Sequence, residues 1–214
     1  MKKMVLLGWL VLLLPAMVSA QEKIEAPVWN VGDKWTFTGD GSIEVVKADQ
    51  SGYILKFSEG KCIIETQGCN TILFEKSTLN KINIVQGDKR KKYTMGLNKI
   101  LDFPLSNGKQ WKSAYSAVQM FGLAKGRNSG DYSEIFSVLG WEDVAVRAGK
   151  FKALKLEYRR VTTGSSAFGG EGIGQEIKNH YWYSPDVKYF VKCQYDKAWV
   201  EESKEVFNWE LTSF

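Results

Sequence analysis

Apolar and polar residues alternate along many short segments of this sequence, and turn residues separate the segments. The clearest run places apolar or aromatic residues at every second position: Val187, Tyr189, Val191, Cys193 and Tyr195. A period of two is the period of a β-strand, whose successive side chains point to opposite faces. No window shows a long, capped helical pattern. The sequence therefore predicts an all-β fold of antiparallel, hairpin-linked strands.

Two long strand patterns dominate the second half of the chain. Residues 151–163 and 176–183 read as strands, joined by a glycine-rich connection at 164–174 and followed by a turn at Ser184-Pro185. The Gly-, Lys- and Asn-containing segment 122–131 reads as a loop. Because open sheet edges tend to pair with other chains, we predict a curved antiparallel sheet that closes into a barrel or half-barrel. A two-sheet sandwich is the alternative.

The first twenty residues have the pattern of a secretory signal peptide. Lys2 and Lys3 precede an apolar run from Val5 to Leu14, and small residues end the segment at Ala20. The run is shorter than the roughly 20 apolar residues of a membrane span. We therefore expect a signal peptide at 1–20, a single antiparallel β domain at 21–214, and no transmembrane segment in the mature chain. The expected location is periplasmic or extracellular.

The charge balance is mild. The formal net charge is +5, and loss of Lys2 and Lys3 with the signal peptide leaves +3. Such a charge favours solubility and gives no reason to expect a nucleic-acid partner. A basic run at Lys89–Lys92 reads either as an anion site or, preferably, as an edge strand protected by its lysines.

Three cysteines leave the disulfide pairing open. Export to an oxidising compartment permits a bridge. Cys62 and Cys69 are close in sequence and flank a Gln67-Gly68 turn, so we predict that they form a disulfide that staples a loop. Cys193 lies at an apolar-phase position and reads as a buried free thiol. The alternative is that all three remain reduced.

Four phrases occur in an order that resembles a known group. They are VGDKWTF (31–37), FPLSNGKQW (103–111), EDVAVRAGKFKALKLE (142–157) and YWYSPDVKYFVK (181–192). The chain resembles the TapB-like group of exported bacterial proteins of unknown function, which is related to a larger uncharacterised periplasmic β-domain family. It departs at Arg147, where that group has proline before Ala-Gly. The resemblance implies a curved sheet or barrel-like domain in the cell envelope, and it carries over no catalytic residues.

The sequence offers little for catalysis. His180 is the one histidine in the chain, which excludes a multi-histidine metal site, and no G-x-S-x-G is present. The glycine run at 169–174 lacks a phosphate-loop ending. Four acidic residues could in principle supply the paired carboxylates of a glycoside hydrolase: Glu142, Asp143, Glu171 and Glu176. Their spacing in the sequence singles out no pair. We therefore predict no enzyme activity, no cofactor and no metal, and we rank a hydrolase as the least favoured reading.

Aromatic residues supply the candidate binding site. Tyr181, Trp182 and Tyr183 are consecutive, so one or two of them point inward and the remainder outward. Together with Tyr189, they are candidates to contact an apolar or glycan ligand, because such rings stack on sugars or line lipid pockets. The competing reading is that they are core residues. The second functional hypothesis is a structural or interaction component of an envelope assembly, with an envelope protein as its partner.

Overall fold

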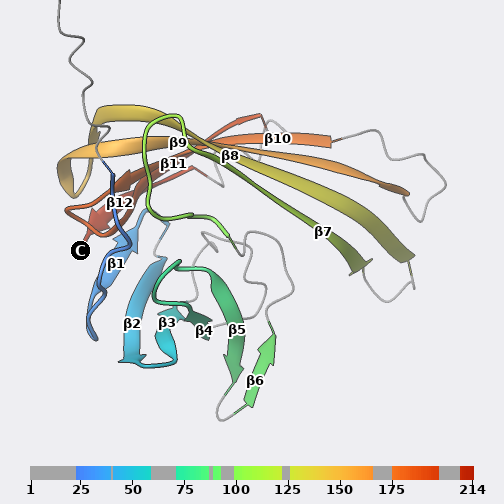
Figure 1. The fold of residues 1–214 in the computed structure, drawn as a ribbon, viewed down its shortest axis with the longest axis horizontal. Helices are drawn as coiled ribbons and strands as arrows, with labels where there is room; N and C mark the ends of the chain where they lie inside the picture. Colours follow the sequence, from blue (N-terminus) through green and yellow to red (C-terminus); the bar gives the residue numbers. More distant parts are fainter. Residues whose placement is uncertain are drawn as a thin grey trace, which may run out of the picture.

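The fold is described from a computed structural model, which covers residues 23–39, 41–58, 71–86, 89–92, 99–121, 126–165, 175–197 and 208–214. These residues form twelve strands, shown in Figure 1. The strands are β1 (Lys34–Phe37), β2 (Ser42–Asp49), β3 (Gly52–Phe57), β4 (Thr71–Phe74), β5 (Lys81–Gln86), β6 (Lys89–Lys92), β7 (Gln110–Phe121), β8 (Gly126–Val146), β9 (Gly149–Ser165), β10 (Gln175–Ser184), β11 (Tyr189–Lys197) and β12 (Trp209–Ser213). The all-β prediction is confirmed for this part of the chain.

All twelve strands belong to one antiparallel sheet. Its order is β6-β5-β4-β3-β2-β1-β12-β11-β10-β9-β8-β7, so the first strand pairs with the last and joins the two halves of the chain. The predicted closure into a barrel is wrong, because the described strands at the two ends of this order, β6 and β7, do not pair with each other. The sheet remains open.

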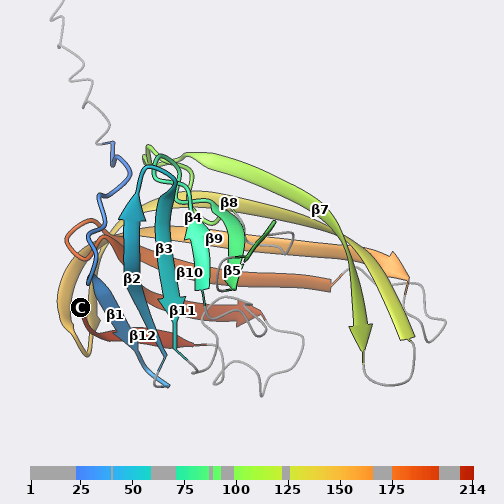
Figure 2. The same ribbon diagram turned by 90° about the horizontal axis from the view of Figure 1, so that it is seen from below.

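The sheet folds over so that its two halves face each other. In Figures 1 and 2 the short strands β1–β5 run across the long strands β8–β11. The joint at β12 is narrow, since only two residue pairs link β12 to each of β1 and β11. Stacked faces with crossing strands bury the inner side chains of both halves, as in orthogonal sheet packing. The sandwich-like core is therefore made by one sheet rather than by two.

Two indole hydrogen bonds connect the two halves of the sheet. Trp35 donates its indole N–H to the carbonyl of Val187 at 2.8 Å, and Trp29 donates its own to the carbonyl of Lys188 at 3.0 Å. Both acceptors lie in the turn between β10 and β11. The Trp35 ring also stacks on Tyr189, with ring centroids 4.9 Å apart. Because 152 residues separate Trp35 from its acceptor, this contact fixes the N-terminal half against the C-terminal half.

The predicted loop at 122–131 is partly wrong. Strand β8 already begins at Gly126, and it pairs with all twelve residues of β7 without a register shift. Cross-strand pairing with a long neighbour thus outweighs the loop-like composition of the segment. Strand β9 is covered on both faces near Ala153. Ala153 and Leu154 are both buried, and the register shift lies in β8, between Val138 and Gly140.

Candidate functional site

The inner face of β10 carries a row of polar and aromatic side chains. Asn179, Tyr181 and Tyr183 alternate along this face, opposite Tyr158, Leu156 and Leu154 of β9, respectively. Tyr181 and Tyr183 are 2% and 0% exposed. Both rings contact Phe190, and the Phe103 ring lies against Tyr183 with centroids 5.7 Å apart. These two candidate residues therefore lie in the core and contact protein side chains there.

Two polar atoms of this row have no hydrogen-bond partner among the described residues. They are Oδ1 of Asn179 and the hydroxyl of Tyr183, on residues that are 1% and 0% exposed. The Asn179 amide donates only a long bond, 3.5 Å, to the Tyr181 hydroxyl. Burial raises the pKa values of Tyr181 and Tyr183 above 10, so both hydroxyls remain protonated donors. Unpaired buried polar atoms are uncommon in native proteins and call for an explanation such as water or a ligand.

Further along the sheet, the inner face becomes more polar. The Glu134 carboxylate of β8 is 0% exposed and accepts hydrogen bonds from Tyr158 at 2.9 Å and Tyr115 at 3.3 Å. Arg160 lies directly opposite Glu134 on β9 and places its guanidinium 5.6 Å from the Tyr132 ring centre. The tyrosine hydroxyls and the neighbouring basic side chain make burial of a carboxylate tolerable.

The remaining candidate aromatics occupy different places. Tyr189 is 3% exposed and lies between Trp29, Trp35 and Phe37 in the core. Trp182 lies on the outer face, opposite Lys155 and Lys192. The four residues therefore do not line one surface.

Charged side chains surround Trp182. It donates its indole N–H to Glu142 at 2.8 Å, and the ammonium groups of Lys155 and Lys192 lie 5.2 and 5.0 Å from its ring centre. Lys155 also pairs with Glu142 at 3.1 Å. The indole hydrogen bond is the largest factor that lowers the pKa of Glu142, and Lys155 adds to it. The ring is 5% exposed, so little of it is available to a ligand in this conformation.

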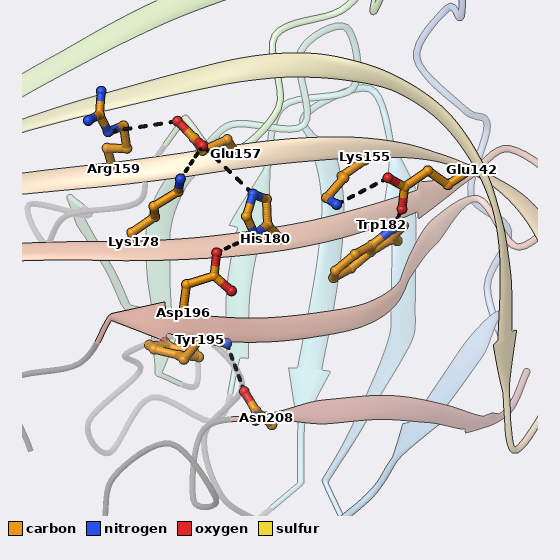
Figure 3. Close-up of polar contacts among 10 residues, drawn as sticks. All are labelled: Glu142, Lys155, Glu157, Arg159, Lys178, His180, Trp182, Tyr195, Asp196 and Asn208. Carbon is orange, nitrogen blue, oxygen red and sulfur yellow. Dashed lines mark hydrogen bonds and ion pairs between the residues drawn. The ribbon is translucent and has the colours of Figure 1, made fainter. Parts of the chain in front are cut away.

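His180 lies on the same outer face as Lys178 and Trp182 (Figure 3). Its Nδ1 lies 2.7 Å from Asp196, and its Nε2 lies 3.7 Å from Glu157. Burial lowers the pKa of His180 below 6.5, against the opposing effect of Asp196. A neutral imidazole that donates its Nδ1–H to Asp196 fits this geometry. The arrangement is a set of cross-strand polar pairs, and among its described members no serine or cysteine nucleophile contacts the imidazole.

Further predicted residues have separate outcomes. Cys193 is buried and free, as expected, and burial raises the pKa of its thiol. Cys62 and Cys69 lie outside the described residues, so their bridge stays a prediction. The acids Glu142 and Glu176 are engaged in ion pairs, the latter with Arg159 at 3.4 Å.

The described segments contain neither a metal-binding cluster nor a membrane-spanning helix. Within them, no three His, Cys, Asp or Glu side chains are grouped so that they can hold a metal ion. In the same segments we find no helix with the length and hydropathy of a membrane span.

The two edges of the sheet differ sharply. The edge strand β6 consists of four basic residues, Lys89–Lys92, which agrees with the reading of this run as a charged edge. The opposite edge strand, β7, is twelve residues long and contains one charged residue, Lys112. Charged residues on an edge strand discourage pairing with other chains, so β7 is the less protected edge.

Sequence reasoning missed Asn179, Glu134 and the β7 edge. The signal for Asn179 was present, because it shares the inward phase of Tyr181 and Tyr183 in a strand that was correctly predicted. Glu134 had no local signal, since its partners Tyr115 and Tyr158 come from two other strands. The β7 edge depends on the order of strands in the sheet, which alternation alone does not give.

Comparisons with known proteins give distant matches. No family model matches the chain, and no curated protein matches it. Among solved structures, it is similar to the hypothetical lipoprotein YmcC from Escherichia coli (K12), with a TM-score of 0.41, 8% identity, and 78% of this chain and 81% of that chain covered. It is also similar to a candidate exported protein with a YmcC-like fold from Bacteroides fragilis NCTC 9343, with a TM-score of 0.39, 14% identity, and 89% and 98% covered. Likeness at this level carries no conclusion about function.

Proposed function

We propose that this protein is an exported, non-catalytic component of a cell-envelope assembly that holds another chain along β7, the edge of the sheet that the described strands form. The observation that carries this proposal is the contrast between the two edges: β6 is basic throughout, whereas β7 has one charge in twelve residues. An edge strand presents unpaired N–H and C=O groups along its length, and an extended segment of another chain satisfies them by adding a strand.

The N-terminal segment supports the proposed location. A basic start, an apolar run and small residues at Ala20 are the pattern of a signal peptide, which supports export to the periplasm or beyond. The resemblance to exported proteins of the TapB-like group supports the same location. Tight packing of the candidate aromatics in the core favours an interaction role over a ligand-binding role.

Site-specific photo-crosslinking in the intact envelope tests this proposal. A benzophenone amino acid replaces Ala114, an exposed β7 residue, and in the control replaces Gln194, an exposed residue of the internal strand β11. We expect an adduct with another chain from position 114 and none from position 194. Absence of an adduct at 114, or equal adducts at both positions, contradicts the proposal.

A second candidate function is ligand binding on the inner face of β10. It is favoured by Oδ1 of Asn179 and the hydroxyl of Tyr183, which a hydroxyl-bearing lipid or glycan would satisfy. Of the predicted ligand residues, Tyr181 and Tyr183 lie on this face, Tyr189 lies in the adjoining core, and Trp182 does not take part.

Native mass spectrometry of the exported protein tests this second function. We expect an additional bound mass that is lost in Tyr183→Phe and kept in Tyr132→Phe, a matched change of a half-buried tyrosine elsewhere on the inner face. Detection of the bare chain alone, under conditions that preserve noncovalent complexes, contradicts it.

A further inference from the structure

The edge of β7 has three properties that favour strand pairing. It is long, since the strand runs from Gln110 to Phe121. It is regular, because its pairing with β8 contains no register shift, whereas five other strand pairs of this sheet do. It lies at the border of the long strands, which project beyond the N-terminal half in both views of Figures 1 and 2. Bulges, short length and charge are the usual protections of an edge, and β7 has none of them beyond Lys112.

We infer that β7 pairs antiparallel with β7 of a second copy of this chain, about a two-fold axis near the middle of the strand. This inference rests on the proposed function and names the partner that the edge holds. In such a pair, the same surface is used on both copies, so both unprotected edges are consumed at once.

Charge placement supports a second copy as the occupant. If the two-fold axis passes through Tyr115, Lys112 lies opposite Val118 of the other strand, which carries no charge. Self-pairing of β7 therefore creates no directly opposed like charges. Self-pairing of β6 places basic residues opposite basic residues, which is unfavourable. Pairing at one edge only produces a closed dimer and stops growth into a filament.

The side chains near the start of β7 are compatible with the close approach of a second strand. Lys112 and Ala114 are exposed on the outer face, while Tyr115 is half-buried on the inner face and stacks on Tyr132 with centroids 4.8 Å apart. The start of the strand is anchored by Trp111, which donates its indole N–H to the carbonyl of Lys99 at 3.0 Å. The edge is thus held in place before a second strand arrives, which lowers the entropic cost of pairing.

Charge-swap variants of Ala114 test the inference. With the axis at Tyr115, Ala114 of each copy lies opposite Ser116 of the other, so the two Ala114 residues are diagonal neighbours, and Ala114→Lys alone and Ala114→Glu alone each bring like charges together. We expect sedimentation velocity of the exported, purified protein to show a dimer for the wild type. Each single variant should dimerise about fivefold more weakly or worse, which corresponds to roughly 1 kcal/mol. An equimolar mixture of the two variants should recover dimer, because unlike charges then meet.

Gln194→Lys is the matched control, since it adds the same charge at an exposed position of an internal strand. It should dimerise as the wild type does. The inference is overturned if the wild type remains monomeric at its highest soluble concentration, if Gln194→Lys weakens the dimer as much as Ala114→Lys, or if mixing restores nothing. A monomeric protein that still crosslinks at position 114 to a different chain overturns the second copy as partner and leaves the proposed function standing. A protein that neither dimerises nor crosslinks there overturns both.

Discussion

Replacement of Trp35 by phenylalanine tests whether the two halves of the sheet are locked by indole hydrogen bonds. The Trp35 ring is 2% exposed, and its N–H donates to the carbonyl of Val187 at 2.8 Å. Phenylalanine retains an aromatic ring beside Tyr189 but has no donor, so the Val187 carbonyl is left unpaired in the core. An unpaired buried acceptor costs about 1–3 kcal/mol. The smaller ring loses roughly 1 kcal/mol of apolar burial as well.

We therefore expect Trp35→Phe to lower the free energy of unfolding by about 2–4 kcal/mol. Urea unfolding followed by far-ultraviolet circular dichroism measures this directly. With a urea slope of about 2 kcal/mol per molar, the midpoint should fall by roughly 1–2 M while the slope is unchanged. An unchanged slope matters because it shows that the folded and unfolded states expose the same surface as in the wild type.

Trp141→Phe is the matched control for this change. Trp141 is half-buried, and within the described residues its indole N–H has no hydrogen-bond acceptor, while the Lys152 ammonium lies 4.9 Å from its ring centre. The same substitution there should cost less than about 1 kcal/mol, because the ring loses some area and no hydrogen-bond acceptor is stranded. Equal losses at Trp35 and Trp141 would refute the view that the hydrogen bond to Val187 carries the effect.

Three further predictions follow from the structure. Gly52→Ala should prevent stable folding, because Gly52 has φ +138° and a Cβ there would lie 2.1 Å from the Phe74 carbonyl oxygen. Gly32 has φ +95° with open space around it, so Gly32→Ala should lower the free energy of unfolding by only about 1–2 kcal/mol in a thermal unfolding experiment. The pKa of His180 is lower in the folded state than in the unfolded chain, so as pH drops from 6.5 the unfolded chain takes up the proton first. The free energy of unfolding should therefore fall as pH drops from 6.5. Its slope against pH should be smaller in His180→Asn. Cys193 should resist thiol reagents in the native protein and react once urea unfolds it, as mass spectrometry of labelled peptides will show; labelling of native protein at this site would contradict its burial.

Local alternation predicted strand faces well where one face is buried. A period of two places Tyr181 and Tyr183 on one face of the strand and His180 on the other, and this requires no knowledge of the neighbouring strands. The same rule could not choose which set of residues faces the core. The core position of Tyr189 follows from Trp29 and Trp35, which are more than 150 residues away in sequence. Which of Trp182 and the tyrosines faces the core could therefore be decided only from the folded structure.

Errors arose where pairing between distant strands outweighed local composition. The segment 122–131 contains Gly, Lys and Asn, and these residues favour turns when judged alone, yet β8 begins at Gly126 because β7 offers it a continuous partner. Barrel closure was predicted from the cost of open edges. The basic run of β6 already indicates that one edge is protected by charge, which removes much of the need to close.

Strand length explains both the open sheet and the free edge. Strands β1–β6 have four to eight residues, whereas β7, β8 and β9 have 12, 21 and 17. Closure would pair β6, with four residues, against β7, with twelve, and would leave most of the longer edge unsatisfied. The short half therefore covers only part of the long half, and the remainder of β7 projects past it (Figure 1). Closure would satisfy only a small part of the β7 edge. A second chain that adds a strand of matching length would also satisfy the backbone groups that β6 would leave unpaired.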